Sequence, residues 1–378
     1  MWYVSRRKGL GNDYEGGNMD KKKFWIGFNH VPGIGPVRMQ YLLDHFGSIE
    51  KAWLASIYEL RQAGLSSKVA EALINTRNSL KLDEIVDRLN REKITVVTWT
   101  DEDYPSLLNE IDASPPVIYM KGAISREDLL CVAVVGTRRT TAYGRAVTED
   151  IVTSLISAGI TVVSGLARGI DGIAHKSALN ANGRTIAVLG SGLDHIYPPE
   201  HSNLAEKISQ NGAVISDYPP GTRPEGKNFP PRNRIISGLS RSVIVTEAGA
   251  DSGALITASF AAEQGRDVFA VPGSIYNQGS KGPHSLIADG AAILTDINEL
   301  FDQLDLGRIR EQETTRAVLP ENRTERTVWQ SISSEPVHID EIRMRCKLSV
   351  QQTTAALTML EMKGRIRQVG PMVYVRIR

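Results

Sequence analysis

The sequence predicts an α/β protein with a Rossmann-like, doubly wound domain and a mostly parallel sheet, between a small helical domain and a winged-helix domain. Three observations predict this. Short β-branched runs alternate with helical stretches from about residue 94 to residue 305, as in doubly wound folds. The runs lack polar alternation, as a parallel sheet buried on both faces requires. Residues 323–378 have the pattern of three helices followed by a hairpin.

The composition is that of a globular protein, with 41% hydrophobic and 23% charged residues, so two or three folded domains are expected. The net charge of +1 does not indicate a polyanionic partner, and any such surface must be local. Cys131 and Cys346 lie in unrelated segments, which favours a reducing cytosol over a disulfide framework or thiolate metal site. No apolar run approaches the ~20 residues of a membrane span. We therefore expect a cytoplasmic protein without membrane association.

The first 18 residues show little hydrophobic patterning and no apolar secretory region. We expect residues 1–18 to be disordered, or to precede a true start at Met19, because Glu-Gly-Gly just upstream is what a ribosome-binding sequence would encode. Residues 19–92 are predicted to form a helical domain of SAM or helix-hairpin-helix type. Its "VPGIGP" turn resembles the helix-hairpin-helix hairpin, whose N–H groups can face a phosphate. A compact turn between packed helices is the alternative.

The doubly wound domain is predicted over residues 93–305. Its predicted strands are "ITVVTW", "CVAVVG", "ITVVSG", "TIAVLG", "AVIS", "SVIVTE", "DVFAVPG" and "AAILT". Ligands of such sheets bind at the carboxyl ends of the strands, where the winding direction reverses. The loops that follow strands are therefore the candidate site.

A polar linker is predicted at residues 306–322, before the winged helix at 323–378. Ser349 and Gln352 form an S-x-x-Q capping box for the third helix of that domain. Residues 307–378 carry 13 Lys/Arg and 8 Asp/Glu, a net charge of +5. This basic surface fits nucleic-acid contact, and a protein-docking or dimerisation module is the open alternative.

The loop "VVGTRRTTAYG" follows a strand and precedes a helix. It is neither a dinucleotide fingerprint nor a P-loop. Its Gly136, the hydroxyls of Thr137 and Thr140, and the guanidinium groups of Arg138 and Arg139 suit phosphate binding. A capped helix with solvated arginines is the alternative.

The loop "VVSGLARGIDGIAHKSAL" has the same strand-to-helix pattern. Asp171 is expected in the first helical turn, where it favours the helix dipole and can hold Arg168. His175 lies four residues later on the same face, and we favour a structural hydrogen bond for this Asp–His pair over catalysis. In the next loop, His195 and His201 are separated by prolines, a poor arrangement for a metal.

The stretch "FPPRNRIISGLS" places Arg232, Asn233 and Arg234 at a helix start. We expect these groups to converge on the crevice where the other loops end. Phe229 either stacks on a base or belongs to the core, and Arg234 can alternatively pair internally with Glu247. The following "TEAGADSGALITA" segment is similar to the phosphate-recognising segment of the cytokinin-activating phosphoribohydrolases. Their P-G-G-x-G-T-x-x-E block is absent here, which weakens an enzymatic interpretation.

Taken together in this order, "GTRRTTAYG", "SGLARGIDGIAH", "GSGLDHIYP", "NFPPRNRIISGLS", "EAGADSGALITA" and "AVPGS…KGPHSLIADGA" closely resemble the DNA-processing protein A (DprA/Smf) family over Val117–Leu294. The resemblance implies a non-enzymatic protein of natural transformation without a cofactor. Such a protein binds and protects incoming single-stranded DNA, loads the RecA recombinase on it, displaces single-strand-binding protein and forms a homodimer.

The resemblance and the loop chemistry give one set of candidate DNA-binding residues, with Arg138 and Arg232–Arg234 foremost. The set is Gly136, Thr137, Arg138, Arg139, Thr140, Ser164, Gly165, Arg168, Lys227, Phe229, Arg232, Asn233 and Arg234. The "HSLIADGA" segment matches the dimerisation region and contributes His284, Leu286 and Ile287. No catalytic or metal-binding residue is expected. This sequence has GTR where many members have GSR, a change that keeps the hydroxyl.

Two other functions compete with recombination mediation. One is a nucleotide-processing hydrolase of the same Rossmann-like superfamily, and the other is a transcription regulator whose winged helix binds duplex DNA. We expect Arg138→Ala with Arg232→Ala to weaken single-strand binding and reduce its salt slope while leaving thermal stability nearly unchanged.

Overall fold

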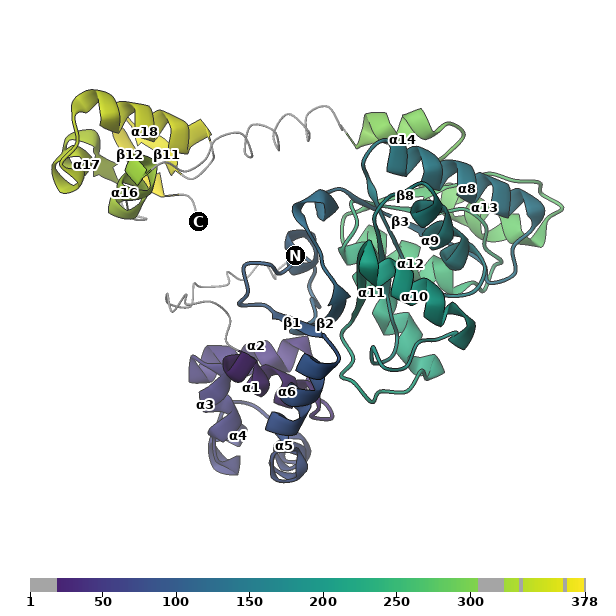
Figure 1. Ribbon diagram of the computed structural model, residues 1–378, viewed down its shortest axis with the longest axis horizontal. Coiled ribbons are helices and arrows are strands. Elements are labelled where there is room, and N and C mark those ends of the chain that lie inside the picture. Colours follow the sequence, from purple (N-terminus) through teal and green to yellow (C-terminus); the bar gives the residue numbers. More distant parts are fainter. Residues whose placement is uncertain (1–18, 305–322, 333–335, 363–365, 377–378) are drawn as a thin grey trace. The chain divides into compact units, whose positions relative to one another are not determined.

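The computed structural model describes residues 19–304, 323–332, 336–362 and 366–376. The predictions for residues 1–18 and for the linker at 306–322 lie outside these residues. The chain divides into two compact units, Met1–Ile297 and Asn298–Arg378, and each is described by itself (Figure 1).

The first unit begins with six helices. They are α1 (Met19–Asn29), α2 (Pro36–Phe46), α3 (Ile49–Leu54), α4 (Ile57–Gln62), α5 (Ser67–Ser79) and α6 (Leu82–Arg91). The "VPGIGP" segment forms a compact turn between α1 and α2, and Arg38 closes it by donating from Nη1 to the carbonyl of Gly33. Pro36 stands in the first turn of α2, where its missing N–H costs no hydrogen bond. Phosphate contact by this turn stays a prediction.

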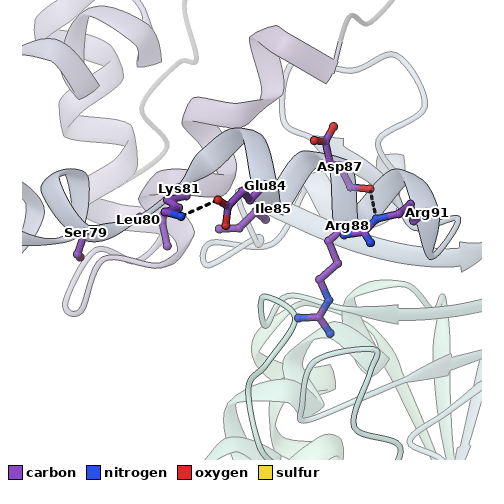
Figure 2. A pocket seen from close by; sticks show the side chains of 8 residues that line it. All are labelled: Ser79, Leu80, Lys81, Glu84, Ile85, Asp87, Arg88 and Arg91. Atoms are coloured by element: carbon purple, nitrogen blue, oxygen red, sulfur yellow. Dashed lines mark hydrogen bonds and ion pairs between the residues drawn. The ribbon is translucent and has the colours of Figure 1, made fainter.

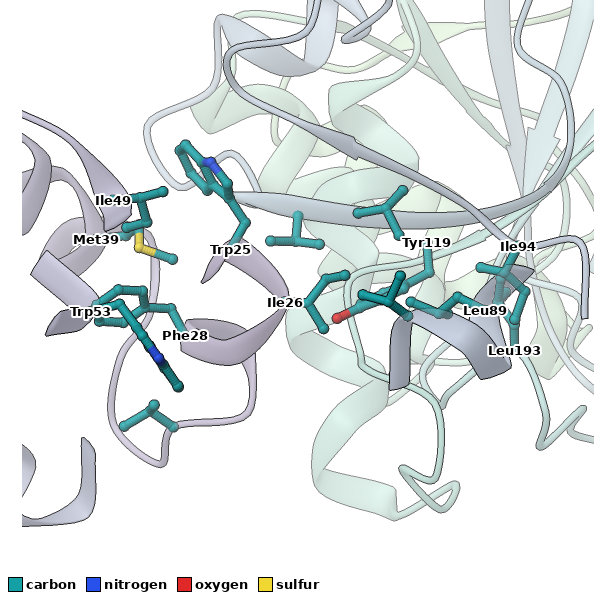
Figure 3. Close-up of a cluster of buried hydrophobic side chains, with 14 of the residues drawn as sticks. Trp25, Ile26, Phe28, Met39, Ile49, Trp53, Leu89, Ile94, Tyr119 and Leu193 are labelled. Carbon is teal, nitrogen blue, oxygen red and sulfur yellow. The ribbon is translucent and has the colours of Figure 1, made fainter. Parts of the chain in front are cut away.

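A continuous hydrophobic cluster joins these helices to the sheet. Figure 3 shows it running from Trp53 and Phe28 through Ile26 to Leu89 and Tyr119. The rings of Phe28 and Trp53 meet edge to face with centroids 5.1 Å apart, a favourable aromatic geometry. Because the buried surface is shared, the helical region and the sheet form one packed body.

The sheet of the first unit has nine strands in the order β1-β2-β6-β5-β4-β3-β7-β8-β9. They are β1 (Thr95–Thr98), β2 (Val117–Gly122), β3 (Cys131–Val135), β4 (Thr161–Ser164), β5 (Thr185–Val188), β6 (Gly212–Ser216), β7 (Ser242–Val245), β8 (Asp267–Ala270) and β9 (Ala292–Ile293). The strands from β6 to β9 pair in parallel, and β2 pairs antiparallel with β1 and β6. The predicted doubly wound fold is confirmed.

The sequence pattern missed β2. Its run "VIYMKG" ends in polar residues and is followed by a short 3-10 turn rather than a long helix, so the strand–helix alternation that revealed the other strands did not apply. The central strands β3, β4, β5, β6 and β7 are buried at every position. This burial explains their uninterrupted apolar runs.

The connecting helices complete the first unit. They are α7 (Ser106–Asn109), α8 (Ala142–Ser157), α9 (Ile170–Asn180), α10 (Ser202–Gln210), α11 (Phe229–Gly238), α12 (Gly253–Glu263) and α13 (Lys281–Ala288), with 3-10 turns η1 (Arg126–Leu129), η2 (Pro199–His201), η3 (Gly226–Asn228) and η4 (Gln278–Ser280). Helix α14 (Ile297–Gln303) follows β9 and, from Asn298 on, belongs to the second unit. No helix among the described residues is long and apolar enough to cross a membrane.

The second unit has the winged-helix order. Its elements are α16 (Arg323–Ser331), β10 (Val337–His338), α17 (Ile339–Cys346), α18 (Val350–Met362), β11 (Ile366–Gly370) and β12 (Val373–Arg376). The capping box of α18 is confirmed, because the Ser349 N–H donates to Gln352 Oε1 at 3.1 Å and the Gln352 N–H donates to Ser349 Oγ at 3.2 Å. The strands form a three-stranded sheet in the order β10-β12-β11.

Leu89 tests whether the shared cluster supports the first unit. The side chain of Leu89 is fully buried, so Leu89→Ala should lower the free energy of unfolding by about 2–5 kcal/mol, because its truncation removes apolar packing and leaves a cavity. Leu54→Ala is the matched control, because Leu54 is 64% exposed and its truncation should change stability by no more than about 0.5 kcal/mol. Urea denaturation measures both. Equal effects would contradict the packing described here.

Candidate nucleic-acid interface

A pocket of about 830 Å³ opens beside the carboxyl ends of the central strands. In the sheet, β3 stands between β4 and β7, so the chain winds outward from β3 in both directions. The segments after β3, β4, β5, β6 and β7 all contribute lining residues. The pocket therefore lies where doubly wound sheets bind their ligands.

The loop after β3 is fixed by the segment that follows β7. The Thr137 N–H donates to the carbonyl of Glu247 at 2.6 Å, and the Thr141 N–H donates to Glu247 Oε2 at 3.0 Å. A Cβ on Gly136 would lie 2.7 Å from the Glu247 carbonyl oxygen, so this close approach requires glycine. The exposed side chains of Arg138 and Arg139 are thus carried into the pocket lining by a well-anchored backbone.

The start of α11 supplies a buried cation to the pocket. Arg232 is only 4% exposed, and its Nη1 donates to the carbonyls of Gly165, at 2.9 Å, and of Val188. Burial lowers the pKa of Arg232 to about 10, against the opposing effect of Asp171. The guanidinium therefore stays charged at neutral pH.

Asp171 is the counter-ion of that cation. Its carboxylate accepts from the N–H groups of Gly165 at 3.2 Å and Ala167 at 3.3 Å. Burial raises the pKa of Asp171, and the charge of Arg232 and these hydrogen bonds oppose the rise. The hydrogen bond from Arg232 to Gly165 joins α11 to the turn after β4, which makes Arg232 structural as well as pocket-lining.

Two partner assignments made for the loop after β4 are wrong. Arg168 pairs with Glu200, with Nε 2.5 Å from Oε1, and Asp171 points instead to the backbone of its own turn. His175 bonds through Nδ1 to Thr185 Oγ1 at 2.7 Å, and burial lowers its pKa to about 3. The residue is therefore a neutral, structural histidine, and its partner lies on the neighbouring strand.

The alternative partner proposed for Arg234 is also wrong. Its Nη2 lies 2.6 Å from Asp217 Oδ2 at the end of β6, whereas the carboxylate of Glu247 accepts from Thr141. Arg234 does form an internal ion pair, with Asp217 instead of Glu247. It is not among the residues that line the pocket.

The pocket brings together seven of the thirteen candidate residues. The lining seven are Gly136, Thr137, Arg138, Arg139, Phe229, Arg232 and Asn233. Thr140 and Gly165 are not among the lining residues, and Ser164 is turned inward to the Val134 carbonyl at 2.7 Å. Lys227 is exposed and pairs with Glu225 at 2.7 Å. Contact of any candidate with DNA stays a prediction.

Other lining residues were not selected from the sequence. They include Tyr197 after β5 and the segment Gly249–Ala254 at the start of α12. The second has a sequence signal, because its glycines and Ser252 follow a strand. Tyr197 stands among prolines without a motif. Phe229 lies against Tyr197 with ring centroids 5.7 Å apart.

The residues predicted for dimerisation lie on α13. His284 Nε2 lies 3.0 Å from the Gly273 carbonyl oxygen, and Leu286 and Ile287 are partly buried. The surface they form stays a predicted interface.

Two family models match this chain. Residues 95–305 match the family model of DNA recombination-mediator protein A, and residues 312–370 match that of the DprA winged helix domain. Protein Smf of Synechocystis sp. is 37% identical, with 94% of this chain and 99% of the relative covered.

Two solved structures are also similar. DNA processing protein A of Streptococcus pneumoniae has a TM-score of 0.67 and 34% identity, covering 74% of this chain and 97% of its own. The protein of the same name from Helicobacter pylori has a TM-score of 0.50 and 30% identity, covering 56% of this chain and 95% of its own. That protein has a single-stranded DNA binding mode.

Because Arg232 is buried, its replacement should destabilise the protein, contrary to the expectation from the sequence. We expect Arg232→Ala to lower the free energy of unfolding by about 3–5 kcal/mol, because it leaves Asp171 buried without its cation. Arg138→Ala, which replaces an exposed arginine beside the same pocket, should change stability by no more than about 0.5 kcal/mol. Chemical denaturation at neutral pH compares the two.

The loss of unfolding free energy in Arg232→Ala, called the deficit below, should also depend on pH. Because the folded-state pKa of Asp171 is already raised, removing Arg232 raises it further. A raised carboxyl pKa favours the folded state below the unfolded-state pKa, and this advantage is lost as pH rises through the folded-state pKa. The deficit should therefore be smaller at acid pH than at neutral pH. The same deficit at both would show that Asp171 is not the group that Arg232 compensates.

Proposed function

This chain belongs to the DNA recombination-mediator protein A family, the DprA/Smf family, and we propose that it binds incoming single-stranded DNA in the pocket beside β3 and β7. In this proposal it protects the strand in the cytoplasm, loads the RecA recombinase on it and displaces single-strand-binding protein. The observation that carries the proposal is the pair of exposed arginines, Arg138 and Arg139, on a loop anchored by Glu247 at the switch point.

The low net charge of the whole chain supports the proposal that a polyanion binds at one local site. The whole chain has a net charge of only +1, so a nucleic acid gains little from long-range attraction and must find its cations at one place. Two exposed guanidinium groups beside helix starts offer such a place. Binding through them would weaken with salt, with a slope of about −0.7 per phosphate neutralised on a single strand.

We further propose that the protein binds without catalysis and acts as a homodimer through α13. Two acid–base groups near the loops are committed to structure: the Glu247 carboxylate accepts from Thr141 at 3.0 Å, and His175 bonds to Thr185 at 2.7 Å. Incubation with nucleoside monophosphates tests the absence of catalysis, and release of free base would contradict it.

Replacing both exposed arginines tests the pocket directly. The double variant Arg138→Ala/Arg139→Ala should bind oligo(dT) more weakly and lower the salt slope by about 0.7 for each phosphate that is no longer neutralised, with an unchanged melting temperature because both side chains are exposed. Fluorescence anisotropy over a range of salt concentrations measures this. Arg61→Ala on α4 is the control, since Arg61 is an exposed arginine paired with Glu71 outside the pocket. Equal affinity of the double variant and wild type would remove the pocket from the proposal.

RecA loading needs a separate experiment. On single-stranded DNA coated with single-strand-binding protein, the wild-type protein should shorten the lag of RecA filament assembly, followed through RecA ATPase activity. The double variant should leave the lag long, and Arg61→Ala should behave as wild type. If the wild-type protein binds DNA and yet leaves the lag unchanged, loading is wrong while single-strand binding stands.

A further inference from the structure

An aromatic surface at the pocket has no role in the proposed phosphate binding. Tyr197 is 37% exposed and lines the pocket together with Phe229. The two ring planes are tilted by 45° with centroids 5.7 Å apart. We propose that Tyr197 is a direct base contact and extends the stacking role considered above for Phe229, so that the two rings form one surface for the bases of a single strand while the arginines hold the phosphates. This inference rests on the proposed function and defines how the ligand lies in its site.

Tyr197 is held exposed by its neighbours. Ile196 packs against the cluster of Figure 3 and Pro198 is buried, so the backbone on both sides is fixed while the ring between them reaches the pocket. Tyr197 is not part of the hydrophobic cluster that joins the helices to the sheet. An aromatic ring with this much apolar surface in water gains from a flat partner.

The loop that carries Tyr197 is held by hydrogen bonds and an ion pair. Ser191 Oγ donates to the His195 carbonyl at 2.7 Å, and the Asp194 carboxylate accepts from the Gly221 N–H at 2.9 Å. Arg88 adds an ion pair, with Nη2 2.7 Å from Asp194 Oδ2, and Figure 2 shows its side chain extending from α6 toward the neighbouring loops. A ring on such a loop gives up little freedom when a ligand binds.

Phe229 is held just as closely. A Cβ on Gly190 would lie 2.8 Å from the Phe229 ring, so the glycine permits the ring to sit on the strand-end loop. The Cζ atoms of Arg138 and Arg232 both lie 5.8 Å from the Phe229 ring centroid, within cation–π range. Because the two rings are already side by side, we expect a base to lie against the exposed Tyr197 ring rather than between the rings.

The charges around the rings separate bases from phosphates. Asp171 and Asp251 also line the pocket, and carboxylates repel phosphate while tolerating a neutral base. Cations stand at the ends of the aromatic surface. Arg138 lies beside Phe229. Arg168 interacts with Tyr197. Its pKa is raised mainly by Glu200 and to a smaller extent by Tyr197. The chemistry therefore selects an unpaired strand, whose bases are free to leave their own stack.

The test combines a protein change with a ligand change. Tyr197→Leu should weaken binding of oligo(dT) by roughly 5- to 150-fold, the range that corresponds to removing one base–aromatic stack. Tyr197→Phe should bind as wild type. On an abasic strand of equal length and charge, Tyr197→Leu and wild type should bind equally. The salt slope should stay unchanged, unlike that of the arginine double variant.

Each other outcome has a definite meaning. If wild type binds oligo(dT) and Tyr197→Leu binds it equally well, the inference is wrong and the proposed function stands. Equal weakening on both strands would make Tyr197 a support of the loop and would also overturn the inference. Absence of wild-type binding to either strand would instead overturn the proposed function. Should Tyr197→Leu fail to fold, Tyr197→Trp replaces it: emission quenched by oligo(dT) but not by the abasic strand supports stacking, and unquenched emission with bound oligo(dT) rejects it.

Discussion

The anchoring of the loop after β3 by Glu247 is the interaction on which the site depends. Glu247 is buried at the end of β7, where its carbonyl receives the Thr137 N–H at 2.6 Å and its carboxylate receives the Thr141 N–H at 3.0 Å. These two bonds fix the loop backbone, while the side chains of Arg138 and Arg139 are exposed. A loop without this anchor would have to be ordered by the ligand itself, at a cost in affinity.

Arg138 and Arg232 belong to one set of candidate residues in the sequence, but they differ in burial. Arg138 is exposed, whereas Arg232 is buried, donates to the carbonyls of Gly165 and Val188 and is electrostatically opposed by Asp171. A buried guanidinium is tolerated because its donors are used and its charge is matched. Arg232 nevertheless lines the pocket, together with Asp171. The site thus combines one fixed cation with two adaptable ones.

Sequence reasoning worked where a repeating pattern determined the structure. The buried parallel strands and the convergence of their loops followed from apolar runs and the carboxyl-edge rule. It failed for pairings that only tertiary structure creates: Arg168 with Glu200, Arg234 with Asp217, and His175 with Thr185. In each case several partners were compatible with the local sequence. Tyr197 was missed for a related reason, because a lone tyrosine among prolines has no periodicity that indicates where its ring lies.

The helical region also contributes to the site. Its cluster reaches Leu193, and Arg88 grips Asp194 one residue further along the same loop. Burial raises the pKa of Asp194, but the Gly221 N–H and Arg88 outweigh it and hold the pKa below its usual value, so this grip persists at neutral pH. A loop held by apolar packing on one residue and by charge on the next has little freedom to reorient. The amino-terminal helices therefore contact the loop that carries Tyr197, and none of their residues is among those that line the pocket.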